Sequence, residues 1–131
     1  MSVRKTVLVV EDEFFAARDL HAAFQAAGYL VLGPVKTEHE ALAVLDKVRP
    51  DAAILDLNLG GRRSMGVVAA LDARGIPFCI ATGYSPSWIP PGYRSRPYLL
   101  KPYHPKAAVD LVGSLISSGP QQTGPQPQSI E

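Results

Sequence analysis

The amino-acid sequence predicts an α/β fold, in which helices cover both faces of a doubly wound parallel sheet of five strands. Short apolar runs lie at intervals along the chain, and segments with helical periodicity separate them. Most of these runs lack alternation between apolar and polar residues, which is typical of strands covered on both faces. Strands that alternate with helices of this length favour right-handed βαβ units. We therefore expect a (βα)5 domain.

The runs that read as strands are Thr6–Val10, Leu30–Val35, Ala52–Asp56, Phe78–Thr82 and Tyr98–Leu100. After the first strand, apolar residues between Ala16 and Ala27 recur with the spacing of one helix face. Gly28 is well placed to end that helix. The next helix opens at Thr37, with Glu40 three residues on in the pattern of a capping box.

Two further helices are expected, from Ser64 to Ala73 and from about Pro105, a favoured first-turn residue. The segment from Ser85 to Pro97 contains four prolines, and none of them can donate a backbone hydrogen bond. We therefore expect the fourth helix of the series to be short or irregular. From residue 117 onward the chain is mostly Ser, Gly, Pro and Gln. We expect one domain over residues 1–116 and a disordered tail over residues 117–131.

Composition narrows the possible classes of function. The 131 residues include 13 basic and 12 acidic side chains, a net charge of +1, without any block of like charge, which does not favour a nucleic-acid or membrane surface. A single cysteine, Cys79, excludes an intramolecular disulfide and a thiolate metal cluster. The apolar run Val7–Val10 is too short for a signal peptide or a membrane span. We expect a soluble, cytoplasmic protein without a separate output domain.

Polar residues stand where the expected strands end, which is where ligands bind in a doubly wound sheet. These residues are Glu11, Asp12, Asp56, Thr82 and Lys101. Three carboxylates in one pocket repel one another unless a cation neutralises them, and hard oxygen ligands select Mg²⁺. Asp56 could then attack an activated phosphoryl donor, with Lys101 and Thr82 as hydrogen-bond donors to the phosphoryl oxygens. Each of these residues taken alone also fits a solvated or capping position. The occurrence of all five at strand ends, in this order, is what favours a phosphoryl-accepting site.

The motifs around these residues resemble those of the receiver domains of two-component response regulators. They are Val7–Glu13, Asp51–Leu59, Ala81–Gly83 and Lys101–Tyr103, and the likeness covers about residues 5–116. The resemblance implies a flavodoxin-like, CheY-like fold and a single-domain response regulator. Such a protein accepts a phosphoryl group on Asp56 from a sensor histidine kinase or a phosphotransfer protein. It signals to a downstream protein by contact, and its only catalysis is self-catalysed phosphoryl transfer and autodephosphorylation.

The same resemblance implies roles for individual residues. Asp12 and Asp56 would ligate Mg²⁺ directly, Glu11 would act through water, and the backbone carbonyl of Asn58 would complete the protein ligands. The Lys101–Pro102 peptide would be cis, which proline permits at low cost. Thr82 and Tyr98 occupy the switch positions of the family, although Tyr98 fits a half-buried strand aromatic equally well.

The segments Pro77–Tyr84 and Arg96–Tyr103 also resemble, imperfectly, a receiver subgroup of the FATGUY type. Its fourth strand ends Phe-Ala-Thr-Gly-hydrophobic-Tyr, and its kinase partners often belong to the HWE class. Here Ile80 replaces the Phe and Ser85 replaces the final Tyr. The proline-rich segment in place of a regular fourth helix is a further departure, because the family commonly signals through that region.

Several other residues suit simpler roles. Cys79 stands among apolar neighbours as a small hydrophobe, and Gly60-Gly61 belongs to no nucleotide-binding pattern. Three histidines lack metal spacing and suit solvated or capping positions: His21, His39 and His104. Four large apolar residues of the proline-rich segment fit either an interaction surface or packing onto the domain itself: Tyr84, Trp88, Ile89 and Tyr93.

Two other functions stay open at this point. A haloacid-dehalogenase-like phosphatase also uses a nucleophilic Asp with Mg²⁺. That family carries two aspartates separated by one residue at the end of its first strand. Here the residue two positions after Asp56 is Asn58, and the acidic pair lies on another strand. A receiver-fold binding module that works without phosphorylation is also compatible with the sequence, although the complete set of site residues favours phosphorylation.

Overall fold

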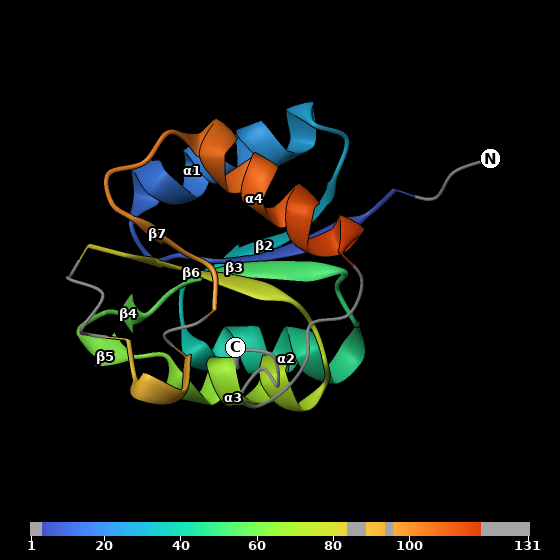
Figure 1. Ribbon diagram of the computed structural model, residues 1–131. Helices are drawn as coiled ribbons and strands as arrows, with labels where there is room; N and C mark the ends of the chain where they lie inside the picture. The colour runs from blue at the N-terminus through green and yellow to red at the C-terminus, as the bar shows by residue number, and fades with distance from the viewer. Residues whose placement is uncertain (1–3, 84–88, 94–95, 119–131) are drawn as a thin grey trace, which may run out of the picture.

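The structure, a computed structural model, describes residues 4–83, 89–93 and 96–118. Its centre is a five-stranded parallel sheet in the order β2-β1-β3-β6-β7, which confirms the expected fold class (Figure 1). The strands are β1 (Thr6–Val10), β2 (Leu30–Val35), β3 (Ala52–Asp56), β6 (Phe78–Thr82) and β7 (Tyr98–Leu100). A small antiparallel hairpin, β4 (Asn58–Leu59) and β5 (Arg62–Arg63), was not expected.

Helices cover the two faces of the sheet, as the sequence predicts. They are α1 (Phe14–Ala26), α2 (Glu38–Lys47), α3 (Met65–Ala73) and α4 (Pro105–Ser117). Figure 1 shows α1 and α4 on one face and α2 and α3 on the other. Between β6 and β7 the described residues form only a short 3-10 turn, η2 (Pro91–Tyr93), in agreement with an irregular fourth helix. Among the described helices, none is both long and apolar enough to cross a bilayer.

Local signals explain where the helices begin and end. The Thr37 hydroxyl accepts a hydrogen bond from the Glu40 N–H at 3.1 Å, as a capping box requires. The Glu40 carboxylate accepts instead from the Lys36 N–H at 2.8 Å, so the return bond reaches one residue further back than the pattern predicts. Gly28 follows α1 with a φ of +94°, a left-handed conformation that only glycine adopts at low cost.

The core has two halves, one on each face of the sheet. Residues of the central strands alternate between them: Leu8, Leu55 and Ile80 pack on the α2/α3 side. Val9, Ile54, Cys79 and Ala81 pack on the α1/α4 side. Because β1, β3 and β6 are buried along their length, their side chains are apolar on both faces, which explains why the sequence shows no alternation there.

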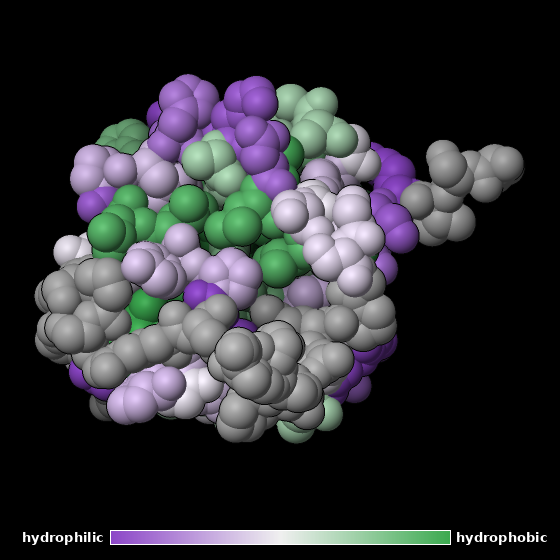
Figure 2. Space-filling model, in the orientation of Figure 1, coloured by the Kyte–Doolittle hydropathy of each residue, from purple (hydrophilic) through white to green (hydrophobic). Residues whose placement is uncertain are grey.

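The two edge strands are less covered than the central three. Leu30 on β2 is 45% exposed and Leu100 on β7 is 46% exposed. Apolar surface lies over β7 and the adjacent side of α4 (Figure 2). The edge position of β2 also accommodates Pro34, since a proline there removes no bond from the interior of the sheet. The Gly33–Pro34 peptide is cis, which was not predicted from the sequence.

The segment between β6 and β7 packs onto the α2/α3 side through Ile89 and Tyr93. Ile89 is fully buried, and Tyr93 packs against the same core half. For these two residues, packing onto the domain is therefore confirmed over an exposed surface. Tyr84 and Trp88 lie outside the described residues. At the other end of the chain, α4 includes Ser117, and the expected tail lies outside the described residues from 119 onward.

Candidate functional site

The expected site residues come from four neighbouring strands that end at the same edge of the sheet. Glu11 and Asp12 follow β1, Asp56 ends β3, Thr82 ends β6 and Lys101 follows β7. Because β1, β3, β6 and β7 are parallel neighbours, their carboxyl ends meet at this edge. The fold thus brings together residues that lie as many as 90 positions apart in the sequence.

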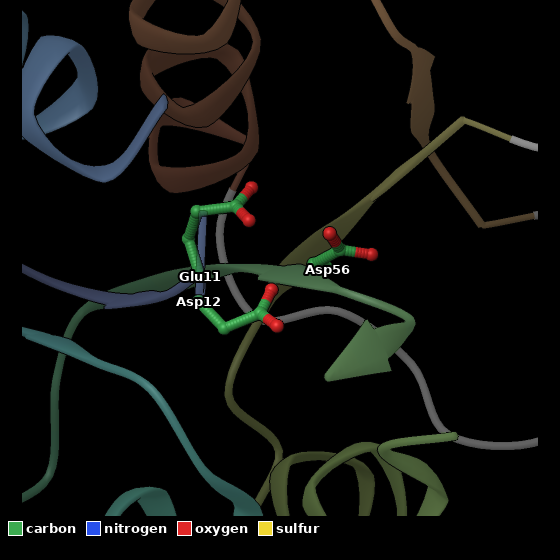
Figure 3. A group of neighbouring side chains, drawn as sticks. All are labelled: Glu11, Asp12 and Asp56. Atoms are coloured by element: carbon green, nitrogen blue, oxygen red, sulfur yellow. The ribbon is translucent and has the colours of Figure 1, made fainter. Parts of the chain in front are cut away.

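The three acidic side chains form a compact cluster. One carboxylate oxygen from each of Glu11, Asp12 and Asp56 lies within 4.8 Å of the others. Figure 3 shows these side chains turned toward a common space, Glu11 and Asp12 from the end of β1 and Asp56 from the end of β3. Glu11 is 1% exposed and Asp56 is 8% exposed, so two of these three acidic residues are largely shielded from water.

Lys101 bridges two of the acids. Its Nζ donates to Glu11 Oε1 at 2.7 Å and to Asp56 Oδ2 at 2.8 Å. Burial raises the pKa of the Glu11 carboxyl above its ordinary value, although the hydrogen bond from Lys101 works in the opposite direction. Burial would lower the pKa of Lys101, but its hydrogen bonds to Asp56 and Glu11 outweigh that effect and the pKa is raised. The lysine therefore stays charged at neutral pH.

The loop after Asp56 is held in place by the acids themselves. The Asn58 N–H donates to Asp56 Oδ1 at 2.9 Å, and the Gly60 N–H donates to Asp12 Oδ2 at 2.8 Å. Gly60 and Gly61 have φ values of +59° and +83°, which the two-residue turn between β4 and β5 requires. From the sequence these glycines were interpreted only as lacking a nucleotide-binding pattern, and no turn was predicted there. A Gly-Gly pair is itself a hairpin signal and could have revealed this loop.

Two further contacts near the site were not predicted from the sequence, one at the end of β3 and one at the start of α3. Ser64 is buried, and its Oγ donates to the backbone carbonyl of Asp56 at 2.8 Å. Ser64 is the N-cap residue of α3, but its side chain makes no capping hydrogen bond. The Glu38 carboxylate, from the start of α2, accepts from the Val67 N–H at 3.2 Å and satisfies one of the open donors at that helix end. Glu38 and Val67 are 29 residues apart in the sequence, so no local pattern predicts this contact.

The other expected residues lie on β6, on β7 and in the segment between β7 and α4. The Lys101–Pro102 peptide is cis, as the resemblance implied. Thr82 is buried, and its backbone carbonyl accepts from the Lys101 N–H at 2.8 Å. Tyr98 lies on the edge strand and is 37% exposed, which fits both interpretations of that residue. His104 Nδ1 accepts from the Lys106 N–H at 3.1 Å and caps α4, as expected for a capping histidine.

The donor set of the cluster fits a hard cation. Glu11, Asp12 and Asp56 offer only carboxylate oxygens, which Mg²⁺ prefers over softer ligands. Their spacing within 4.8 Å is close enough for one ion to be shared. The arrangement can therefore bind a divalent cation beside a shielded carboxylate that also contacts an ammonium group.

Solved structures of several bacterial proteins are similar to this chain. SdrG from Sphingomonas melonis Fr1 is 38% identical over 89% of this chain and 99% of its own, with a TM-score of 0.76. The chemotaxis response regulator CheY4 of Vibrio cholerae is 25% identical over 86% of this chain and 99% of its own, with a TM-score of 0.75. The receiver domain of the sensor histidine kinase PA1611 from Pseudomonas aeruginosa PAO1, described with a magnesium ion coordinated in its active-site cleft, shares the fold at 20% identity over 88% of this chain and 99% of its own, with a TM-score of 0.70.

Curated relatives are regulatory proteins that are longer than this chain. The Positive alginate biosynthesis regulatory protein of Pseudomonas aeruginosa is 37% identical over 81 residues, and the Transcriptional regulatory protein PdtaR of Mycobacterium tuberculosis is 26% identical over 120 residues. These alignments cover 57% and 88% of this chain, but only 33% and 58% of the two relatives. A scan against protein-family models finds no match.

Proposed function

This chain belongs to the CheY-like family of response-regulator receiver domains, and we propose that it accepts a phosphoryl group on Asp56 in a two-component phosphorelay. The observation that carries the proposal is the position of Lys101 Nζ, 2.8 Å from Asp56 Oδ2 and inside a cluster of three carboxylates. The buried Asp56 carboxylate thus contacts the Lys101 ammonium group, and it lies beside Glu11 and Asp12, with which it can hold a cation. The donor would be a sensor histidine kinase or a phosphotransfer protein.

In this proposal each residue has one chemical task. An Asp56 carboxylate oxygen attacks phosphorus, the bond between phosphorus and the donor histidine nitrogen breaks, and Asp56 becomes an acyl phosphate. The Lys101 ammonium and the Thr82 hydroxyl donate to the phosphoryl oxygens, which carry the negative charge of the transferring group. Hydrolysis of the acyl phosphate returns the domain to its starting state. We propose no catalysis beyond this self-catalysed cycle.

Mg²⁺ is the cofactor that the acid cluster suits. Asp12 and Asp56 would bind the ion directly, Glu11 would bind through water, and the backbone carbonyl of Asn58 would complete the protein ligands. When bound, the ion neutralises charge on the phosphoryl oxygens. The chemistry of the donor set supports this assignment, as does the magnesium described for the PA1611 receiver.

The backbone offers a route from the site to the edge of the sheet. The Thr82 carbonyl accepts from the Lys101 N–H at 2.8 Å, and Thr82 pairs in register with Leu100 on β7. Movement of Thr82 toward a phosphoryl group would therefore pull on β7, where Tyr98 lies. We propose Thr82 and Tyr98 as the switch pair, with the apolar surface over β7 as one region that a downstream protein reads (Figure 2).

Other aspects of the proposal concern partners and setting. Phe14 and Phe15, at the start of α1, are 62% and 59% exposed, so large apolar groups are available to a protein donor next to the site. The FATGUY-type resemblance suggests an HWE-class kinase as that donor. We assign the receiver domain to residues 1–117, one residue beyond the expected boundary, because α4 ends at Ser117. We assign its action to the cytoplasm, through protein contacts and without nucleic acid or membrane.

The test is to incubate the protein with Mg²⁺ and a small acyl-phosphate donor and to measure its intact mass. We expect a gain of one phosphoryl group, which hydroxylamine removes, and no gain in Asp56→Asn, whose amide keeps the shape but is a poor nucleophile. Lys101→Ala should retain Mg²⁺ binding better than it retains labelling, since the ammonium contacts phosphoryl oxygens and not the cation. A phosphoryl group that persists on Asp56→Asn would refute the assignment.

A further inference from the structure

Tyr103 carries a buried hydroxyl that has no hydrogen-bond partner among the described residues. Such groups are uncommon, because a buried hydroxyl without a partner loses the hydrogen bonds that water would give it. Phenylalanine would fill the same space without this loss. The hydroxyl is therefore more readily explained by a hydrogen bond that forms in another state of the domain.

The Tyr103 side chain lies on the same face of the sheet as Glu11. Tyr103 packs against the core half that contains Val9 and Ala81, between the sheet and helices α1 and α4. Glu11 lies two residues beyond Val9, so it continues the same face of the strand. In Figure 3 the Glu11 side chain lies nearer to the helix above the sheet than the Asp12 side chain does.

The electrostatics of Tyr103 agree with this position. Burial is the main reason that the pKa of Tyr103 is raised, and the negative charge of Glu11 is the next. The hydroxyl therefore keeps its proton at neutral pH and can act as a hydrogen-bond donor.

Glu11 depends on a donor that phosphorylation would remove. Lys101 Nζ serves Glu11 and Asp56 at the same time, at 2.7 and 2.8 Å. If Lys101 turns to a phosphoryl group on Asp56, Glu11 loses its strongest hydrogen bond while it remains 1% exposed. The Glu13 N–H, which donates to Glu11 Oε2 at 3.1 Å, leaves Oε1 without a replacement.

We propose that the Tyr103 hydroxyl is the reserve hydrogen-bond donor to Glu11, unused while Lys101 holds both acids and engaged when Lys101 turns to the phosphoryl group. Tyr103 is a positioning residue in this scheme, because its hydroxyl would act on Glu11 and not on the phosphoryl group. It would keep the Glu11 carboxylate oriented toward the cation site in the phosphorylated state. That Tyr103 engages Glu11 during signalling rests on the proposed function. That the Tyr103 hydroxyl can donate to Glu11 when the lysine is absent does not.

A double-mutant cycle tests the proposal without phosphorylation. Lys101→Met removes the ammonium from Glu11 permanently, so Tyr103 should engage Glu11 in that background. We expect Tyr103→Phe to change the folding equilibrium constant by less than about threefold in the wild type, where the hydroxyl has no partner, and to lower it about tenfold or more in Lys101→Met. Adding Glu11→Leu to Lys101→Met should abolish the effect of Tyr103→Phe.

Tyr29→Phe is the matched control, because Tyr29 packs on the same core half and its ring lies 5.1 Å from that of Phe24. It should have the same effect in both backgrounds. If Lys101→Met does not fold, Lys101→Gln serves as the second background. Equal effects of Tyr103→Phe with and without the lysine would overturn the proposal, whatever the outcome of labelling at Asp56. Coupling in the cycle with no labelling would leave the Tyr103 contact standing and refute the phosphoryl-acceptor function.

Discussion

The segment that replaces a regular fourth helix is attached to the domain by Arg96, and replacing this residue by methionine tests how strongly. The Arg96 side chain is 4% exposed and forms an ion pair with Asp72 on α3 at 2.5 Å. Its guanidinium also lies over two aromatic rings, 5.3 Å from the centre of Phe78 and 5.6 Å from that of Tyr93. Methionine keeps most of the apolar volume but removes the charge and the donors.

The expected cost follows from what is left behind. Removing one partner of a buried ion pair costs roughly 3–5 kcal/mol, because the other charge stays without compensation. Asp72 is 20% exposed and can recover some hydration, which favours the lower end of that range. Each cation–π contact adds about 0.5–1 kcal/mol, part of which the methionine packing retains. We expect Arg96→Met to lower the free energy of unfolding by about 3 kcal/mol.

Urea unfolding followed by circular dichroism measures this change. The double variant Arg96→Met/Asp72→Leu should recover stability to within about 1 kcal/mol of the wild type, since a pair of apolar groups can replace a buried ion pair. Arg74→Met is the control, because its 3.6 Å pair with Asp46 is exposed by 40% and 74% and should be worth less than about 0.5 kcal/mol. A cost of less than about 1 kcal/mol for Arg96→Met, or no recovery in the double variant, would refute the reasoning.

Two other predictions concern Gly66 and Cys79. A Cβ on Gly66 would lie 2.6 Å from a Glu38 carboxylate oxygen, so Gly66→Ala should displace that cap at a cost of about 1 kcal/mol. The gain in helix propensity from Gly to Ala is also about 1 kcal/mol. Measured by urea unfolding, Gly66→Ala should therefore change the stability of the wild-type protein little but stabilise the Glu38→Ala variant by about 1 kcal/mol. Equal effects of Gly66→Ala in both backgrounds would contradict this prediction. Burial raises the pKa of the Cys79 thiol from 9.0 to about 12, so between these values the unfolded chain loses a proton that the folded chain keeps. The free energy of unfolding should therefore fall by roughly 1 kcal/mol per pH unit above about pH 9, relative to a Cys79→Ala variant measured in parallel. Equal pH dependence of the two proteins would disprove this prediction.

The sequence alone was sufficient for the five strands of the main sheet and the four α-helices, because their signals are local. Apolar runs without alternation marked the central strands, and both Thr37 and Gly28 lie at helix boundaries that the structure confirms. The ends of the parallel strands could be identified in the same way. Since a doubly wound sheet places those ends at one edge, Asp56 and Lys101 could be assigned to one site before any contact was known.

Only the tertiary structure decided how the site residues pair. That Lys101 serves Glu11 and Asp56 together depends on three chain segments meeting, and no local pattern records which atoms then come within 3 Å. The same holds for Arg96, whose partner is 24 residues away on α3, and for the buried hydroxyl of Tyr103. Helix and strand patterns arise from neighbours a few residues apart, whereas hydrogen bonds and buried charges are satisfied by whatever the packed fold brings beside them.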